Sequence, residues 1–349
     1  MIGTFQTIAA IARTTIVVLG LLTASVGGSV GGWVGVANAD FAAGVNARDL
    51  EHDGLTRIYD VYAPASYDGT KPTSLVLDFH GFSSPKEGQA SLSGFRELAD
   101  QEGFLVAWGQ GTGGDLAWSW NGGSCCGAGV RDQVDDVGFV RAMIQAIAAE
   151  GSVDTRRVYA TGLSNGGAMT HRLACEAADV IAAAAPMAFG LPFSEPSNCQ
   201  PSRPITLFSV MGLTDTVVSY AGGFTPGAVE TFDFWRDHNG CDEGDPDVVE
   251  TTGMATCEIY TRCDATTQTA LCSIVADDFA NVPPLQQFAG HLLYLNDDLD
   301  LAQEAWSVMR LHALPLPEPS AALLQLCAIT GVFALARRRR YCSGARSIR

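Results

Sequence analysis

One stretch of the sequence decides the fold: RVYATGLSNGG, at residues 157–167. Its apolar first half ends in the pattern Gly-x-Ser-x-Gly around Ser164, and a helical pattern begins directly afterwards. This order predicts a strand, a sharp turn that exposes the serine hydroxyl, and a helix; the two glycines make room for the turn. Residues 27–31 match the same pattern but lack the flanking elements. Ser164 is therefore the candidate nucleophile.

On both sides of this stretch, short apolar runs alternate with helical patterns along most of the chain. The clearest helix is predicted at 134–150, where apolar residues recur every three or four positions. Strands are expected at 55–62, 74–79, 104–108, 158–161, 182–185 and 205–210, with paired strands in 257–276; further helices are expected at 94–102, 228–238 and 300–312. The alternation predicts an α/β fold whose mostly parallel central sheet has helices on both faces. The run at 55–62, which is followed closely by Pro64, is expected to be an antiparallel edge strand.

The first 39 residues have the composition of a secretory signal peptide. Arg13 precedes an apolar run, and Ala37-Asn38-Ala39 is a small-residue cleavage site before Asp40. The alternative is an uncleaved membrane anchor, although the apolar run is short for a span. We therefore expect an exported, extracellular or cell-surface protein whose folded body covers residues 40–313.

Residues 314–349 have a different pattern. Pro317-Glu318-Pro319 is followed by the apolar residues 320–336 and by four arginines at 337–340. This order resembles the bacterial PEP-CTERM sorting tail, which implies transient anchoring by the C-terminal helix and processing by a sorting protease. The chain departs from that pattern by extending nine residues past the arginines. A simple C-terminal membrane anchor is the alternative.

Charge and cysteine content narrow the choice of partners. Residues 40–316 contain 37 acidic and 14 basic residues, a net charge of −23, which disfavours nucleic acid and other polyanions. Eight cysteines remain once Cys327 and Cys342 in the tail are set aside, and an even number in an exported protein predicts disulfides. Spacings typical of a zinc site are missing, so no metal is expected, and the pairing stays open. The eight candidates are Cys125, Cys126, Cys175, Cys199, Cys241, Cys257, Cys263 and Cys272.

Reactive groups of a parallel sheet gather at the carboxyl ends of its strands. His80-Gly81-Phe82 follows the strand at 74–79, so the backbone N–H groups of Phe82 and Asn165 are the candidate oxyanion donors. A tight turn with a satisfied histidine is the alternative. We assign His80, Trp118 and Trp120 to substrate binding, although the two tryptophans are most simply explained as core or rim residues.

The acid and the base are predicted from chain order. Asp215 follows the strand at 205–210, where a carboxylate would orient the catalytic histidine, and the order serine, acid, histidine then leaves His238, His291 and His312. His291 is the best candidate because it lies in a loop between the last strand pattern and the closing helix. The alternatives are a turn or capping aspartate and a surface or helix-capping histidine.

Several motifs in one order resemble the exported polyhydroxybutyrate depolymerase and feruloyl esterase family. They are WSWNGGSCCG at 118–127, VDDVGF at 134–139 and GLSNGG at 162–167, followed by Leu173-Ala174-Cys175. The resemblance spans about residues 57–306. It implies an α/β-hydrolase fold, serine ester hydrolysis with Ser164, Asp215 and His291 at the triad positions, and a disulfide from Cys125 or Cys126 to Cys175. The chain departs from the family at Met211, where histidine is expected, and in an apparent insertion at 275–289.

These observations predict an exported serine esterase that needs no cofactor. Its substrate would be a feruloyl or acetyl ester of plant polysaccharide, or a polyester such as polyhydroxybutyrate, and its other partners the export machinery and the sorting protease. A secreted serine peptidase on the same fold is one alternative. A surface-displayed, carbohydrate-binding pseudoenzyme is another, although the intact triad positions argue against it.

Overall fold

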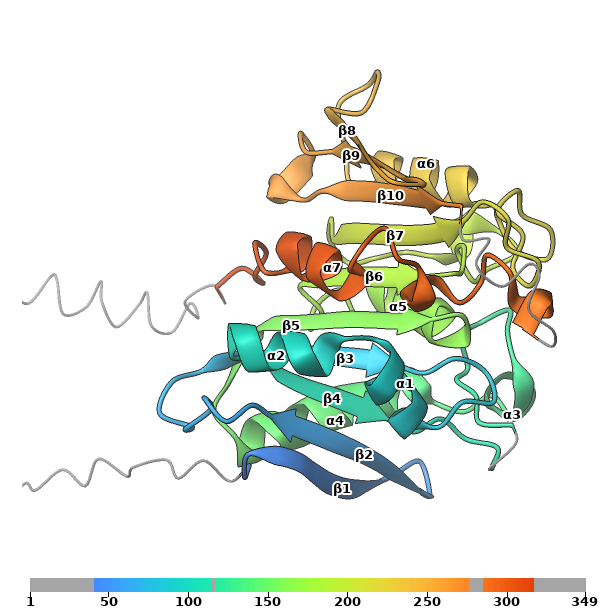
Figure 1. Cartoon of the computed structure of the whole chain (residues 1–349). Coiled ribbons are helices and arrows are strands. Elements are labelled where there is room, and N and C mark those ends of the chain that lie inside the picture. The colour runs from blue at the N-terminus through green and yellow to red at the C-terminus, as the bar shows by residue number, and fades with distance from the viewer. Residues whose placement is uncertain (1–40, 115–116, 276–284, 317–349) are drawn as a thin grey trace, which may run out of the picture. The chain divides into compact units, whose positions relative to one another are not determined.

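The computed structural model describes residues 41–114, 117–275 and 285–316, which form one sheet with helices on both faces (Figure 1). In space, the strand order of this ten-stranded sheet is β1-β2-β4-β3-β5-β6-β7-β10-β9-β8. The strands are β1 (Gly44–His52), β2 (Leu55–Ala63), β3 (Thr73–Phe79), β4 (Leu105–Gly109), β5 (Val153–Leu163), β6 (Ala183–Met187), β7 (Thr206–Gly212), β8 (Val248–Thr252), β9 (Ala255–Tyr260) and β10 (Thr269–Ile274). The helices are α1 (Lys86–Leu92), α2 (Phe95–Glu102), α3 (Gly127–Arg131), α4 (Asp136–Glu150), α5 (Asn165–Glu176), α6 (Ala228–His238) and α7 (Leu301–Met309). The predicted α/β architecture is confirmed.

The middle of the sheet is parallel and both edges are antiparallel. Strands β4, β3, β5, β6, β7 and β10 run in one direction, and apart from the first half of β5 their residues are almost all buried, because helices cover both faces. At the edges, β1 pairs with β2, and β8 with β9, in antiparallel hairpins. The prediction of 55–62 as an edge strand was wrong, since β1 lies outside it. β1 and β8 were missed because neither contains a fully buried residue, which leaves little apolar signal.

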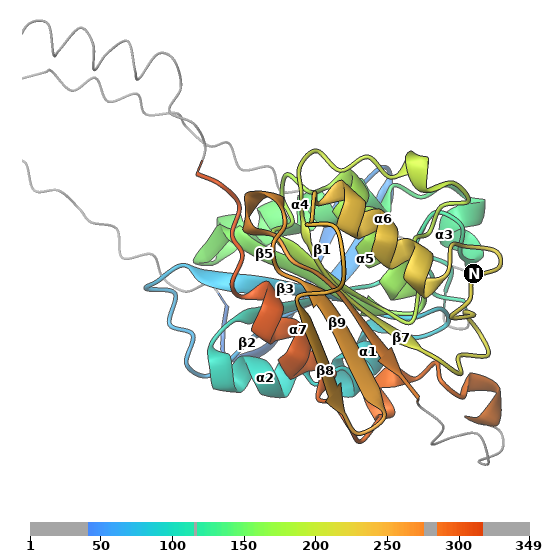
Figure 2. The same cartoon turned by 90° about the horizontal axis from the view of Figure 1, so that it is seen from above.

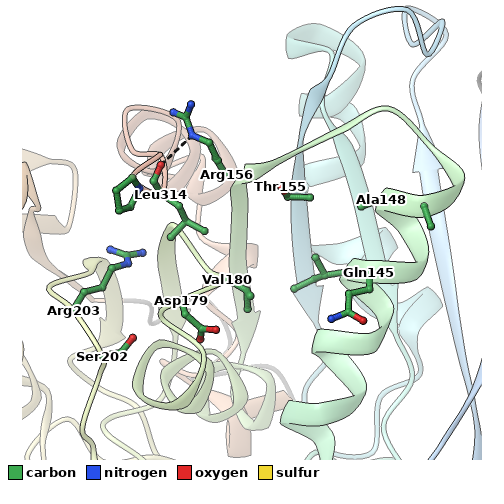
Figure 3. A pocket seen from close by; sticks show the side chains of 12 residues that line it. Gln145, Ala148, Thr155, Arg156, Asp179, Val180, Ser202, Arg203 and Leu314 are labelled. Carbon is green, nitrogen blue, oxygen red and sulfur yellow. Dashed lines mark hydrogen bonds between the residues drawn. The ribbon is translucent and has the colours of Figure 1, made fainter. Parts of the chain in front are cut away.

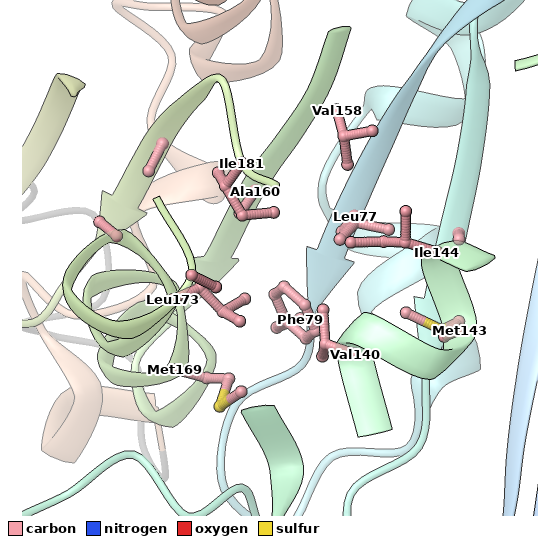
Figure 4. Close-up of a cluster of buried hydrophobic side chains, with 14 of the residues drawn as sticks. Leu77, Phe79, Val140, Met143, Ile144, Val158, Ala160, Met169, Leu173 and Ile181 are labelled. Atoms are coloured by element: carbon pink, nitrogen blue, oxygen red, sulfur yellow. The ribbon is translucent and has the colours of Figure 1, made fainter. Parts of the chain in front are cut away.

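Two layers of helices pack on the two faces of the sheet (Figure 2). Helices α4, α5 and α6 bury their apolar sides against one face, whereas α1, α2 and α7 cover the other. Figure 4 shows the first core, in which Leu77 and Phe79 of β3 lie between Val140 of α4 and Leu173 of α5. These packed layers hold the carboxyl ends of the parallel strands in fixed positions.

Disulfides join all eight predicted cysteines, which confirms the disulfide prediction. The pairs are Cys125–Cys126, Cys175–Cys199, Cys241–Cys263 and Cys257–Cys272. The expected bridge from Cys125 or Cys126 to Cys175 was wrong. Asn165, at the start of α5, donates to the carbonyl of Cys125, whereas Cys175 lies ten residues further along the helix, about 15 Å away.

Three predictions fall on parts of the chain outside the described residues: the signal peptide, nearly all of the sorting tail, and most of the insertion at 275–289. Leu314, the first residue of the predicted tail, is held on the folded body, because it exchanges two hydrogen bonds with Arg156. Among the residues that the structure describes, no helix is long and apolar enough to span a membrane.

Candidate active site

The turn between β5 and α5 holds Ser164 in an unusual backbone conformation. Its φ of 58° and ψ of −120° lie outside the regions that serine prefers, a strain of about 1–3 kcal/mol that the surrounding packing must offset. The N–H of Ser164 donates to Met187 in β6, 2.9 Å away. Gly166 permits the close approach of α5 to β3, because a Cβ there would overlap the carbonyl of Phe79. The predicted strand, turn and helix are confirmed at this point.

The structure brings Ser164, Asp215 and His291 together. The Nε2 atom of His291 lies 2.8 Å from the Ser164 hydroxyl, and its Nδ1 atom lies 2.7 Å from the Asp215 carboxylate. The other oxygen of that carboxylate accepts from the N–H groups of Val217 and Val218, both at 2.8 Å. Because the acid accepts the Nδ1 proton, Nε2 is left free to accept the proton of the serine hydroxyl.

The other two histidines after Asp215 lie at the opposite end of the sheet. His238 Nε2 is 3.3 Å from the carbonyl of Arg203, which precedes β7, and the His312 carbonyl accepts from Tyr159 in β5. Ser164 follows the carboxyl end of β5, so neither side chain can reach it. Of the three candidates left by chain order, only His291 is in contact with Ser164.

The two backbone N–H groups predicted as oxyanion donors belong to Phe82 and Asn165, in segments that meet at the turn. A Cβ on Gly81 would be 3.5 Å from the Cβ of Ser164, which places the peptide joining Gly81 to Phe82 against the turn. Asn165 directly follows Ser164 and begins α5, so its N–H has no partner within the helix. Neither N–H donates a hydrogen bond to any of the described residues. The Asn165 side chain instead binds the backbone of Trp120.

Two of the three predicted substrate contacts were wrong, because His80 and Trp120 are completely buried. His80 Nε2 lies 2.9 Å from the N–H of Gly111, and the Trp120 indole donates to the His80 carbonyl. These side chains support the loop instead of facing a substrate. Trp118 is half-buried in the wall of a separate hollow, which is not lined by Ser164, Asp215 or His291. Its assignment to substrate binding therefore stays a prediction.

A cavity of about 310 Å³ opens onto Ser164 and His291. Its wall is mainly apolar, with two polar side chains, Ser84 and Gln89, so it suits an apolar group with a polar edge. The apolar wall residues are Phe82, Leu92, Leu163, Val217, Phe288 and Leu292.

A buried acid, Asp78, supports the wall of this cavity and was not predicted from the sequence. Asp78 accepts hydrogen bonds from Gln89, Ser93 and Trp108 at 2.6–2.9 Å, and burial raises the pKa of Asp78 to about 6. Asp78 therefore ties α1, which carries Gln89, to β3. One available signal was a single charged residue inside an otherwise apolar strand.

A larger cavity, of about 720 Å³, lies at the other end of the sheet (Figure 3). It is lined by Arg156 at the amino end of β5, by Arg203 and by Leu314, with α4 on one side. Ser164, Asp215 and His291 do not line this larger cavity. The smaller cavity is therefore the candidate site, despite its size.

The sheet order, the strained serine after β5, and an acid and a histidine that follow later strands define the α/β-hydrolase fold. The solved structure of a thermostable esterase superposes with a TM-score of 0.53, covering 77% of this chain and 63% of that chain at 16% identity. That likeness supports the fold alone.

Sequence comparison finds similarity to esterases. The chain is 34% identical over 223 residues to feruloyl esterase B of Piromyces equi, which covers 60% of this chain and 40% of the relative. A bifunctional acetylxylan esterase/xylanase of Neocallimastix patriciarum is 33% identical over 167 residues, 48% of this chain and 22% of the relative. The chain thus spans less than half the length of these two relatives. No protein-family model matches it.

Proposed function

We propose that the chain is an exported serine esterase that hydrolyses carboxylic esters of plant polysaccharide. The single observation that carries this proposal is the His291 ring, which contacts the Ser164 hydroxyl with one nitrogen and the Asp215 carboxylate with the other. A serine is a weak nucleophile by itself, and such a base is what activates it. The similarity to feruloyl and acetylxylan esterases supports the same reaction.

The mechanism follows from the positions of the atoms. Ser164 Oγ attacks the ester carbonyl carbon while His291 Nε2 takes the hydroxyl proton, and Asp215 stabilises the imidazolium. The N–H groups of Phe82 and Asn165 stabilise the negative charge on the former carbonyl oxygen. His291 then returns the proton to the leaving alcohol. In the second step a water molecule, deprotonated by the same nitrogen, attacks the acyl carbon; the bond to Ser164 Oγ breaks, His291 returns the proton to that oxygen, and the acid leaves.

The size and lining of the cavity favour an aromatic acyl group such as feruloyl. A volume of about 310 Å³ exceeds what an acetyl group needs and lies at the lower end of the range for small-ligand pockets. Phe82 and Phe288 offer aromatic surface, whereas Ser84 can bind the ring hydroxyl or methoxy group. The polysaccharide would stay outside the cavity as the leaving alcohol. Export is supported by the disulfides, which persist in oxidising compartments.

A hydrolysis panel tests the proposal: methyl ferulate, p-nitrophenyl acetate, acetylated xylan, polyhydroxybutyrate and casein, each with the wild type and with Ser164→Ala. We expect the highest kcat/KM on methyl ferulate, and no hydrolysis by the variant. A fluorophosphonate probe should label Ser164 alone. Cleavage of casein without ester hydrolysis would favour a peptidase, and polysaccharide binding without any turnover would favour a pseudoenzyme.

A further inference from the structure

The peptide that joins Gly81 to Phe82 is held by the side chain of His80. The Gly81 carbonyl oxygen lies 2.8 Å from His80 Nδ1 and also accepts from the N–H of Ser84, at 3.2 Å. The adjoining carbonyl, that of His80, accepts from the Trp120 indole at 3.2 Å. Both carbonyls of this short loop are therefore bound to protein donors.

The tautomer of His80 follows from its neighbours. Its Nε2 atom lies 2.9 Å from the N–H of Gly111, which can only donate, so Nε2 is the acceptor. The Gln110 side-chain amide also lies 2.9 Å from this nitrogen, and its oxygen is already bound to the N–H of Lys86. Burial lowers the pKa of His80 to about 4, so the ring is neutral at pH 7. The single ring proton is therefore on Nδ1, which donates to Gly81.

This hydrogen bond sets the direction of the neighbouring N–H. The peptide unit is planar and trans, so the Gly81 carbonyl and the Phe82 N–H point in opposite directions within one plane. When the carbonyl is held by His80, the N–H cannot turn. The Gly81 backbone packs beside Ser164, so the N–H that is held in this way lies beside the nucleophile.

We infer that His80 is a positioning residue, whose Nδ1–H group aims the Phe82 N–H at the oxyanion without touching the substrate. This inference rests on the proposed esterase function. An oxyanion donor is effective because it is oriented before the reaction begins, so a donor that can rotate loses most of its effect in the transition state. The substrate itself, whose carbonyl carries little charge, should bind almost as well.

Two substitutions at position 80 separate the two nitrogens of the ring. In His80→Asn the amide nitrogen is bonded to Cγ, as Nδ1 is, so it can still donate to Gly81. In His80→Gln the amide lies one bond further out. Its oxygen can replace Nε2 as the acceptor for the Gly111 N–H, but the donor to Gly81 is lost. His80→Asn gives up the two hydrogen bonds that Nε2 accepts, from Gly111 and Gln110, whereas His80→Gln gives up only the one that Nδ1 donates, so the thermal midpoint of His80→Asn should fall at least as far.

We expect His80→Gln to lower kcat about 10²-fold with KM within twofold of the wild type, and His80→Asn to retain kcat within about tenfold. An arylboronic acid, which forms a tetrahedral adduct on Ser164, should show the same order of affinities. This binding assay needs no ester turnover, so it still reports on His80 if the proposed reaction is wrong. Equal kcat and boronate affinity in the two variants, whether retained or lost, would overturn the inference.

Discussion

At the scale of single residues, His291 differs from the other histidines after Asp215 in what it touches. Its two ring nitrogens are 2.7 Å and 2.8 Å from an acid and a hydroxyl, whereas His238 and His312 lie near Arg203 at the far end of the sheet. The three residues therefore form a matched set, in which one side chain contacts the nucleophile and two do not.

We predict that His291→Ala lowers kcat by about 10⁴- to 10⁶-fold, since the serine then has no base. His238→Ala should stay close to the wild type in kcat, and so should His312→Ala. Steady-state kinetics on a chromogenic ester, with circular dichroism of each purified variant, checks this. A folded His291→Ala variant with wild-type turnover would contradict the assignment.

At the scale of elements, the long loop between β4 and α4 depends on a buried ion pair. Arg57 of β2 donates to Asp136 at 2.6 Å, and both side chains are almost completely buried. The second oxygen of Asp136 accepts from the N–H of Asn121, next to Trp120. The pair thus connects the sheet, α4 and the loop that packs under the active site.

We predict that Asp136→Ala lowers the free energy of unfolding by about 3–5 kcal/mol, because it leaves the Arg57 charge buried without a partner. Asp132→Ala is the matched control: it removes an exposed carboxylate that pairs with Arg131, and should leave unfolding unchanged. Urea denaturation measures both. Similar losses in the two variants would argue against a structural role for the buried pair.

The disulfide between Cys175 and Cys199 ties the end of α5 to the chain before β7. Peptide mapping without reductant should recover this pair, and also Cys241–Cys263 and Cys257–Cys272. Replacing both Cys175 and Cys199 by alanine should lower the free energy of unfolding by about 3 kcal/mol, given the length of the loop that they close. Recovery of a peptide that joins Cys175 to Cys125 would contradict this pairing.

At the scale of the whole molecule, buried titratable groups set the response of stability to pH. His171 accepts from Trp235 and contacts the Phe189 carbonyl, and burial lowers the pKa of His171 to about 3. Burial lowers the pKa of His80 in the same way, to about 4. Both histidines stay neutral in the folded protein, whereas in the unfolded chain they take up protons below about pH 6.5. The stability that they contribute is therefore complete above that pH and is lost on acidification. Asp78, with a raised pKa, has the opposite effect between about pH 4 and 6.

We predict that His171→Gln, whose amide can still donate to Phe189, flattens the pH dependence of stability. Between pH 6 and pH 4, the slope of the unfolding free energy should decrease by about 1.4 kcal/mol per pH unit relative to the wild type. Asp78 and His80 are unchanged in the variant, so their effects cancel in the comparison. Parallel stability curves for the two proteins would show that His171 does not titrate in this range.

The α/β class, the turn at Ser164, and the choice of Asp215 and His291 as its candidate partners could all be predicted from the sequence alone. These depend on local patterns: apolar periodicity, a glycine-flanked serine, and residues that follow strand ends. The polar edge strands β1 and β8 lacked such a pattern, because a strand with one solvated face needs few apolar residues.

Which side chains face the cavity and which are buried became clear only from the three-dimensional fold. His80 and Trp120 lie in motifs typical of a site, yet both are buried where the loop held by the Arg57–Asp136 pair packs on the sheet. The partner of Cys175 could not be predicted from the sequence either, because Cys175 lies about 15 Å along helix α5 from the end that contacts Cys125. Burial and pairing depend on contacts between segments far apart in the chain, and local sequence patterns do not record those contacts.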